Sequence, residues 1–222
     1  TVPGLGTSFG RGGATQSLQD MANADCIVIQ GSNMAECHPV GFQWVEEARS
    51  RGATVIHVDP RFTRTSAVCD KHIPIRAGSD VVLLGALINH VLTHDLWFRE
   101  YVLAYTNAST ILSEDFLDTD DLDGLFSGFD AETRTYDTES WQYAGREARG
   151  EDEHEEAEER AAATGMVHEA HGMPVREEPQ RDETLQHPRT VYQVLKRHYS
   201  RYTPELVEEA CGISREQFQE VA

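Results

Sequence analysis

Basic residues are scarce in this sequence: 19 lysines and arginines stand against 38 aspartates and glutamates, which gives a formal net charge of −19. A nucleic-acid-binding protein needs a basic surface that neutralises phosphates, and so does a protein that binds an anionic membrane. Long apolar runs are also absent, and no stretch reaches membrane-spanning length. The first residues show no signal-peptide pattern. The composition therefore argues against nucleic acid and anionic lipid as partners.

Cysteines are few, and they do not show the C-x-x-C spacing of zinc and iron–sulfur sites. The four are Cys26, Cys37, Cys69 and Cys211. Four histidines also lack a metal-binding spacing, and we expect them to be structural: His57, His72, His90 and His94. No nucleophile–base pair stands out, so the sequence predicts neither a metal ligand nor a catalytic residue in this chain.

A strand–helix–strand pattern between residues 25 and 80 is the element around which the fold is expected to form. The apolar run Cys26–Ile29 is typical of a strand buried on both faces, with its cysteine as a small core residue. A helix is predicted over Pro39–Arg51, a second strand over Thr54–Val58, and a shorter third strand over Lys71–Ile75. The fold class is therefore α/β: a Rossmann-like parallel sheet with flanking helices.

Helical periodicity predicts the buried side of the helix at 39–51. Val40, Trp44 and Ala48 are four residues apart, so we expect them to face the core together with Val45. The residues before the first strand are rich in glycine, and we expect positions 1–16 to form a tail or turn.

Further helices are predicted after the strand–helix–strand pattern and near the end of the chain. The run 81–92 is almost continuously apolar, which predicts a helix buried on most sides. Asp95 is expected to cap the helix that follows. Near the end, Thr203 with Pro204 predicts one helix start, and the capping box at Ser214 predicts another.

Composition divides the chain into three parts. Residues 1–145 are expected to form the α/β domain. Residues 146–182 contain the like-charge block 151–160, which cannot pack on itself, so we expect an acidic, disordered insertion. Residues 183–222 are expected to form a small helical tail. Both ends of the sequence look cut, which favours a piece of a longer protein.

Polar residues follow each predicted strand, at the edge where open parallel sheets bind ligands. After the first strand come Asn33, Glu36 and His38, with backbone amides at 31–32; after the second come Asp59, Arg61 and Thr63; Gly78, Ser79 and Asp80 form a third loop. A carboxylate at a second strand's end commonly receives a ribose or the donor edge of a base. Amides at a helix start can receive a pyrophosphate. The glycine spacing is not G-x-G-x-x-G, which disfavours an ordinary NAD site, and Asp59 before Pro60 is alternatively a plain turn.

In this order the sequence resembles the molybdopterin oxidoreductases, through Cys26–His38, His57–Ala67 and Ile75–Asp80. Later stretches resemble the large catalytic subunit of a respiratory-type formate dehydrogenase. These stretches are Glu100–Val102, Tyr105–Ser109, Gly124–Gly128, Thr184–Arg189 and His198–Glu205. The resemblance covers nearly the whole chain apart from the acidic insertion.

The resemblance implies a molybdopterin guanine dinucleotide cofactor that carries molybdenum or tungsten. By position, one guanine dinucleotide would be lined by Gly31, Asn33, Ala35, Glu36 and His38. Its guanosine would be received by Asp59, Pro60, Arg61 and Thr63, and the pocket would be completed by Gly78, Ser79 and Asp80. Formate would be oxidised to carbon dioxide, and iron–sulfur clusters elsewhere in the subunit would pass the electrons on.

The resemblance also implies parts that this sequence does not contain. The family's selenocysteine or cysteine followed by histidine would lie a few residues before Thr1, and the cluster-binding cysteines would lie further upstream. The implied partners are formate, the rest of the large subunit and an iron–sulfur subunit, with a membrane cytochrome subunit as a further candidate. The side of the membrane, periplasmic or cytoplasmic, is left open. Two alternatives are a related enzyme for nitrate or a sulfoxide, and a non-catalytic nucleotide-binding module.

Overall fold

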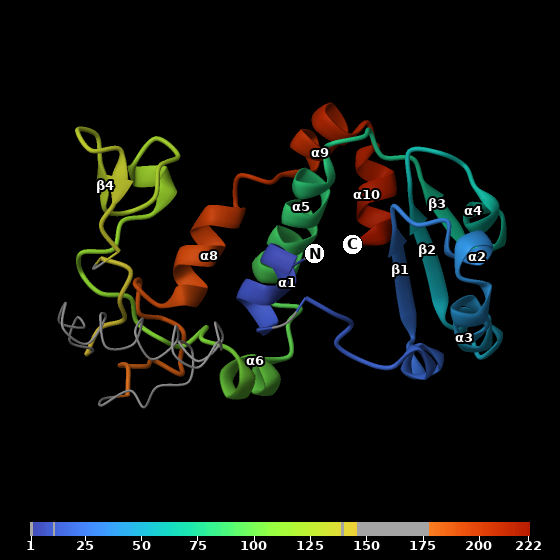
Figure 1. Cartoon of the computed structure of the whole chain (residues 1–222), viewed down its shortest axis with the longest axis horizontal. Helices are drawn as coiled ribbons and strands as arrows, with labels where there is room; N and C mark the ends of the chain where they lie inside the picture. Colours follow the sequence, from blue (N-terminus) through green and yellow to red (C-terminus); the bar gives the residue numbers. More distant parts are fainter. Residues whose placement is uncertain (1, 11, 139, 146–177) are drawn as a thin grey trace, which may run out of the picture. The chain divides into compact units, whose positions relative to one another are not determined.

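The structure is a computed structural model that describes residues 2–10, 12–138, 140–145 and 178–222 (Figure 1). The chain forms two compact units. The first unit combines Thr1–Val91 with Tyr202–Ala222, and the second comprises Leu92–Arg201. The first unit is thus discontinuous in sequence, because the second interrupts it.

A parallel three-stranded sheet is the centre of the first unit. Its strands are β1 (Cys26–Gln30), β2 (Thr54–Val58) and β3 (Lys71–Ile73), in the order β1-β2-β3. Gln30 is level with Val58, and Val58 is level with Ile73, so the carboxyl ends of all three strands lie at one edge. The mixed α/β prediction with a parallel sheet is confirmed.

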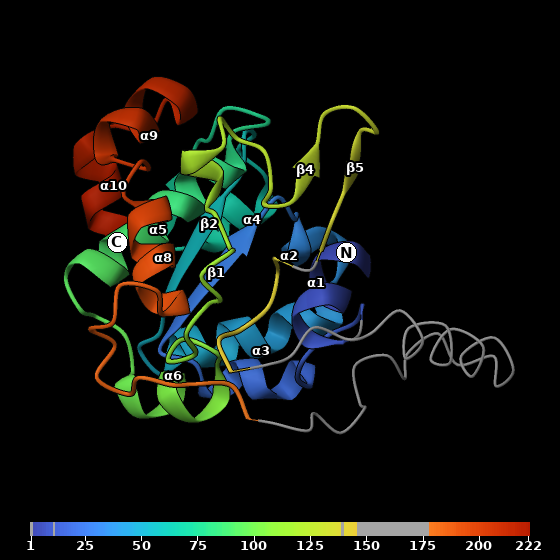
Figure 2. The ribbon, with the colours of Figure 1, turned by 90° about the vertical axis from the view of Figure 1, so that its left-hand side faces the viewer.

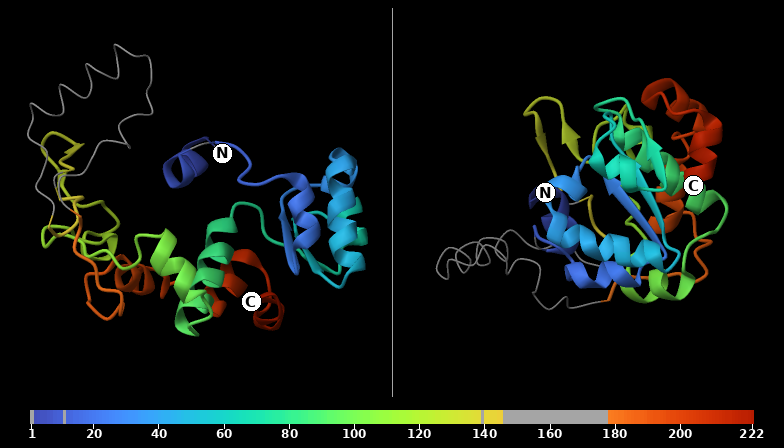
Figure 3. Two further views of the ribbon diagram at one scale, coloured as in Figure 1. Left: turned by 90° about the horizontal axis from the view of Figure 1, so that it is seen from below. Right: turned by 90° about the vertical axis from the view of Figure 1, so that its right-hand side faces the viewer.

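One face of the sheet is covered by segments that follow β1 and β2 directly or precede β1 (Figure 1 and Figure 3, right). These are the 3-10 helix η1 (Leu18–Asn23), α2 (Met34–Cys37), α3 (Pro39–Ser50) and α4 (Arg64–Val68). The buried residues of this face are Ile29, Phe42, Val45 and Val55. This half of the core is therefore formed by segments that lie close to one another in the sequence.

The other face is covered by helices from both stretches of sequence that make up the first unit. They are α5 (Asp80–Thr93), α9 (Pro204–Cys211) and α10 (Arg215–Val221). Their core includes Ile56 and Val58 of the sheet with Leu83, Val207 and Phe218, all at most 4% exposed. The ion pair of Lys71 with Glu220 joins β3 to α10. The last 21 residues are thus part of the first core.

The predicted helix starts near the end of the chain are confirmed. Thr203 Oγ1 accepts a hydrogen bond from Leu206 N at 3.3 Å, and Pro204 is the first residue of α9. Ser214 Oγ accepts from Gln217 N at 3.2 Å, and Gln217 Oε1 accepts from Ser214 N at 3.2 Å. This reciprocal pair is the capping box that the sequence pattern predicts.

The prediction that the first strand is buried on both faces is wrong. Cys26 is exposed rather than a core residue, and Val28 is 51% exposed. Within the described residues β1 is at the edge of the sheet. The core of α5, α9 and α10 reaches β2 and β3 but not β1, which leaves the Cys26–Val28 side of that strand uncovered.

Two predicted helix faces are also corrected. In α3, Val40 is 75% exposed and Trp44 is half-buried, whereas Phe42, Val45 and Ala48 form the buried side. The prediction that Val45 and Ala48 are buried is confirmed, whereas Val40 and Trp44 lie outside the buried stripe. That stripe packs with Ile29 and Val55 of the sheet. In α5, one side is buried, but the apolar side chains on the other are exposed, because neighbours cover only part of its surface: Val81 (70%), Leu84 (45%) and Ile88 (40%).

Two further expectations about local structure are wrong. Asp95 does not cap a helix: α6 (Arg99–Tyr105) begins four residues later, and Asp95 has a positive φ of 53°. Its Oδ1 instead accepts a hydrogen bond from Tyr192 Oη at 3.2 Å. The glycine-rich start was expected to be a tail or turn, but it contains the helix α1 (Val2–Phe9).

The second unit is built from short elements around a small core. It contains α6, the 3-10 helix η2 (Thr119–Asp121), α8 (Val191–Tyr199) and a hairpin of β4 (Phe129–Asp130) and β5 (Thr135–Tyr136) (Figure 2). Ala108, Leu185 and Tyr192 are its buried core residues. Among the residues that the structure describes, no helix is long and apolar enough to cross a bilayer.

The predicted acidic insertion lies mostly outside the described residues, since 146–177 are not described. Its last residues are described: Ile111 N donates to Gln180 O, and Asp182 N donates to Ser109 O. The side chain of Asp182 accepts from Thr184 Oγ1 at 2.6 Å and from the amides of Gln186 and His187. These bonds, led by that of Thr184, lower the pKa of Asp182 to about 2. The predicted disorder and domain boundaries stay predictions.

Candidate functional site

The three candidate loops begin at the same edge of the sheet. Because the strands are parallel and in register, the residues after Gln30, Val58 and Ile73 are neighbours in space. Gln30 Nε2 donates to Asp80 Oδ1 at 2.8 Å, which joins the end of β1 to the start of α5. The predicted site residues are therefore brought to one edge, in the geometry that open α/β sheets use for ligands.

The loop after β1 is held by hydrogen bonds to α4. Gly31 adopts a φ of +63°, and its amide donates to Val58 O. Asn33 Oδ1 accepts from Thr65 Oγ1 at 3.0 Å, and Ala35 N donates to Thr65 Oγ1 at 3.0 Å. Thr65 is fully buried, so it is a fixed anchor for this loop. The loop is therefore rigid before any ligand binds.

The first loop also presents exposed charge. Glu36 Oε2 accepts from Asn33 Nδ2 at 2.6 Å, and its other oxygen is 3.8 Å from Arg64 Nε. Glu36 and His38 are exposed, whereas Asn33 and Ala35 are half-buried. Of the predicted residues in this loop, Asn33 has its side chain engaged in holding the fold, while His38 is open to solvent.

Asp59 is a buried carboxylate at the end of β2. It is 6% exposed, and its Oδ1 accepts from Arg61 N at 2.8 Å. Its Oδ2 is 3.8 Å from His57 Nε2, and its carbonyl is 3.0 Å from His72 Nε2. One carboxylate oxygen thus closes a turn, as the alternative interpretation predicts. Pro60 and Arg61 follow as exposed residues.

His57 connects two of the candidate loops, a role that the sequence did not reveal. It is 0% exposed, its Nδ1 is 2.8 Å from Ser66 Oγ, and its Nε2 is 3.1 Å from Ser32 O. The carbonyl can only accept, so Nε2 carries the proton and Nδ1 accepts from the serine hydroxyl. Ser66 Oγ in turn accepts from Thr63 N at 2.8 Å. This chain of bonds fixes Ser32 and Thr63 relative to β2.

Burial lowers the pKa of His57, and the carboxylate of Asp59 opposes that effect without outweighing it. The folded state therefore binds fewer protons than the unfolded state below the usual histidine pKa of about 6.5. We expect the free energy of unfolding to fall as the pH drops from 7 toward 5. Urea unfolding of the chain and of His57→Gln at several pH values tests this, since the variant lacks the titrating group. Parallel pH profiles for the two proteins would contradict it.

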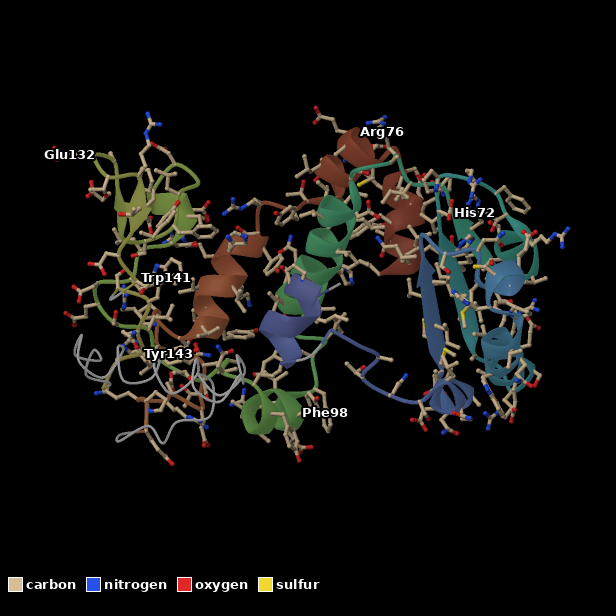
Figure 4. All side chains as sticks on the ribbon, in the orientation of Figure 1. His72, Arg76, Phe98, Glu132, Trp141 and Tyr143 are labelled. Carbon is tan, nitrogen blue, oxygen red and sulfur yellow. The ribbon has the colours of Figure 1, made fainter. Side chains whose placement is uncertain are left out.

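The third loop is anchored both by α9 and by a bond within the loop itself. Arg76 N donates to Cys211 O at 2.8 Å, and Arg76 Nη1 donates to Glu209 O at 2.7 Å. Gly78 has a φ of +86° with open space around its α-carbon, and Ser79 Oγ donates to Arg76 O at 2.6 Å. Figure 4 labels His72 of β3 and Arg76 of this loop. Residues near the end of the chain thus position Gly78 and Ser79.

A wide hollow of about 490 Å³ lies elsewhere in the first unit. It is lined by Glu46, Arg49, Ser50, Gly52, Ala53, Thr54 and Asp70. Thr54 begins β2, so the hollow is at the end of the sheet opposite the candidate loops. Its polar residues are engaged in structure: Asp70 accepts from Val55 N at 2.8 Å and from Arg49 Nε at 2.9 Å. We therefore place the candidate site at the loops and not in this hollow.

The loops offer the groups that an anionic nucleotide needs. They combine a buried carboxylate at Asp59 and an exposed guanidinium at Arg61 with two glycines, Gly31 and Gly78. Both glycines have a positive φ, and a β-carbon on either would have no neighbouring atom within 4 Å. Among the described residues, His, Cys, Asp and Glu side chains form no group of three that could hold a metal ion.

Comparisons with known proteins identify a family and several relatives of this chain. The family described as molybdopterin oxidoreductase matches residues 6–167. Formate dehydrogenase-O major subunit from Escherichia coli is 43% identical over 222 residues, covering 100% of this chain and 19% of its own length. Formate dehydrogenase 2 subunit alpha (cytochrome c-553) from Nitratidesulfovibrio vulgaris is 41% identical over 216 residues, covering 97% of this chain and 18% of its own.

One solved structure, acetylene hydratase from Pelobacter acetylenicus, aligns with a TM-score of 0.45 and 15% identity, over 92% of this chain and 18% of that one. The chain spans about a fifth of the length of the curated relatives above. The family match covers well over half of the chain, in agreement with the resemblance in its loop sequences. The chain therefore belongs to the molybdopterin oxidoreductase family.

Proposed function

We propose that the chain is part of the catalytic subunit of a formate dehydrogenase, where it helps to hold a molybdopterin guanine dinucleotide. The observation that carries this proposal is the 41–43% identity to formate dehydrogenase alpha and major subunits over 97–100% of the chain. The matched stretch includes all three candidate loops. A match of this length is specific, whereas any one loop alone would be weak.

The site residues divide into three groups by their proposed contacts. One guanine dinucleotide is lined by Gly31, Asn33, Ala35, Glu36 and His38. Its guanosine is received by Asp59, Pro60, Arg61 and Thr63, and the pocket is completed by Gly78, Ser79 and Asp80. The geometry supports these roles through the shared sheet edge, the exposed Arg61 and the open surroundings of the two glycines.

The protein's contribution is binding and orientation. When bound, the molybdenum or tungsten pterin would supply the two-electron chemistry that converts formate to carbon dioxide. The buried Asp59 carboxylate would accept hydrogen bonds from guanine or ribose donors, and the exposed Arg61 beside it would contact the same guanosine. The His57–Ser66 bond holds the loop around them in place before binding, which lowers the entropy cost of ordering it. Electrons would leave through iron–sulfur clusters elsewhere in the full subunit.

We expect the 222-residue chain alone to show no formate-dependent dye reduction, whereas the full-length protein, purified with its cofactor, should reduce the dye with formate. The reason is that the chain contains no cysteine pair at cluster-binding spacing, and its described residues offer no metal-binding group. Nitrate and a sulfoxide are assayed in parallel as rival substrates. Reduction of either by the full-length protein without formate oxidation would contradict the proposal, as would metal-dependent turnover by the isolated chain.

A further inference from the structure

Four aromatic rings of the second unit are packed against one another and yet exposed. They are Phe126, Phe129, Tyr136 and Trp141, which we call the aromatic platform. Their exposed fractions are 59%, 36%, 39% and 47%, and the centroids of the contacting ring pairs are 5.2 to 6.4 Å apart. Single exposed apolar side chains are common, but a contiguous patch of this kind usually marks an interaction surface.

A hollow of about 410 Å³ continues the platform. It is lined by Leu112, Phe116, Leu117, Thr119, Phe126, Ser127, Trp141 and Tyr143. Phe126 and Trp141 belong to both, so the rings form one wall of the hollow. Its lining is mainly apolar, and its volume is in the range of pockets that receive large side chains or small ligands. Figure 4 labels Trp141 and Tyr143 on this segment and Glu132 on the hairpin.

The rings are displayed on a fixed backbone. Trp141 Nε1 donates to Ser127 O at 2.8 Å, and Asp137 N donates to Gly128 O at 2.8 Å. Gly128 has a φ of +79°, and a β-carbon there would come within 1.8 Å of Asp137 O, so only glycine fits. A surface that is ordered before binding loses little conformational entropy when a partner docks.

The segment of the sequence that carries the platform is rich in acidic residues. Between residues 112 and 143 the sequence contains ten aspartates and glutamates and one basic residue, Arg134. Arg197 of α8 and Arg201, two residues after that helix, pair with three of these acids, at 118, 120 and 121. Others remain exposed, including Asp123 and Glu132, and we call these exposed acids the acidic rim. An apolar surface combined with exposed acids favours a partner that combines apolar and positively charged side chains.

We propose that the aromatic platform and its hollow are a docking surface for another polypeptide, through a segment with large apolar side chains flanked by lysines or arginines. A second copy of this chain is disfavoured, because its net charge of −19 would repel the acidic rim. Aromatic rings in a hollow beside a charged rim have the composition of binding hot spots. The proposal does not depend on the proposed function of the sheet-edge loops.

The test uses the full-length protein with a photo-crosslinking phenylalanine analogue at position 126. We expect irradiation in cells to give a crosslink whose peptide belongs to another polypeptide and contains apolar residues beside lysine or arginine. A crosslink within the same polypeptide, a crosslink to a second copy, or no crosslink at all would overturn the proposal. The analogue at Tyr105, which is 75% exposed and outside the platform, is the control.

Variants of the same protein measure the strength of the contact. Phe126→Ser is expected to weaken binding of the crosslinked partner at least tenfold, because it removes the central ring. Glu132→Lys should slow association and reduce its dependence on salt, since a rim charge acts mainly on the association rate. Tyr105→Ser and Glu209→Lys are matched controls, and unchanged binding by both platform variants would overturn the proposal. Glu132 is exposed on the hairpin, so its variant keeps the test valid if Phe126→Ser fails to fold.

Discussion

Asp59→Asn in the full-length protein is expected to lower molybdopterin content by about ten- to a hundredfold while the protein remains folded. Loss of a charge-assisted hydrogen bond at a buried site costs roughly 1.5–3 kcal/mol, which corresponds to that range. Asparagine keeps the oxygen that accepts from Arg61 N, so it preserves the turn at the end of β2. The variant therefore separates a ligand role from a turn role.

The measurement is metal and pterin content per folded protein. Asp115→Asn is the matched control, because Asp115 is an exposed aspartate of the second unit and is not one of the proposed site residues. If Asp59 only closes the turn, Asp59→Asn will retain the wild-type content and Asp59→Ala will lose stability instead. Full cofactor content in the asparagine variant would remove Asp59 from the proposed site.

A second large effect is expected from the end of the chain. Phe218→Ala should destabilise the first unit by about 3–5 kcal/mol, the usual cost of deleting a buried aromatic ring. Phe218 is 1% exposed and packs into the core that contains Ile56 and Val58 of β2. Amide exchange at β2 reports this effect directly, since those amides should lose protection. Phe62→Ala is the control, because that ring is 70% exposed.

Removal of residues 202–222 extends the same test. It takes away α9, α10 and the carbonyls that hold Arg76, so exchange at β2 and in the loop at 76–80 should both become fast. Full protection of β2 in the chain ending at Arg201 would show that the carboxyl-terminal helices are not needed for the first core.

Local patterns predicted the elements of the fold well. The strand at 54–58, the short strand beginning at Lys71 and the caps at Thr203 and Ser214 follow from apolar runs and capping residues close in sequence. The three loops were correctly placed at one edge, because parallel pairing follows from strand–helix–strand order. The resemblance to formate dehydrogenase was confirmed by long, collinear matches.

Errors arose where distant parts of the chain decide the outcome. Periodicity correctly indicated Val45 and Ala48 as buried residues of α3. It also indicated Val40 and Trp44, because the spacing alone does not show which side of the helix meets the sheet. Asp95 looked like a cap, yet it meets Tyr192, which is 97 residues away. His57 was correctly expected to be structural, but its link from Ser32 to Ser66 could not be predicted from spacing, since it depends on how two loops meet.

The interrupted first unit has a consequence for synthesis on the ribosome. The strands and α5 are complete by residue 93, but α9 and α10 emerge only after more than a hundred further residues. At about 5–20 residues per second, the apolar side of β2 and β3 stays without its covering helices for roughly 5 to 25 s. During that interval the nascent chain presents aggregation-prone surface. Codon choices that speed translation between residues 93 and 204 should therefore raise the yield of folded protein.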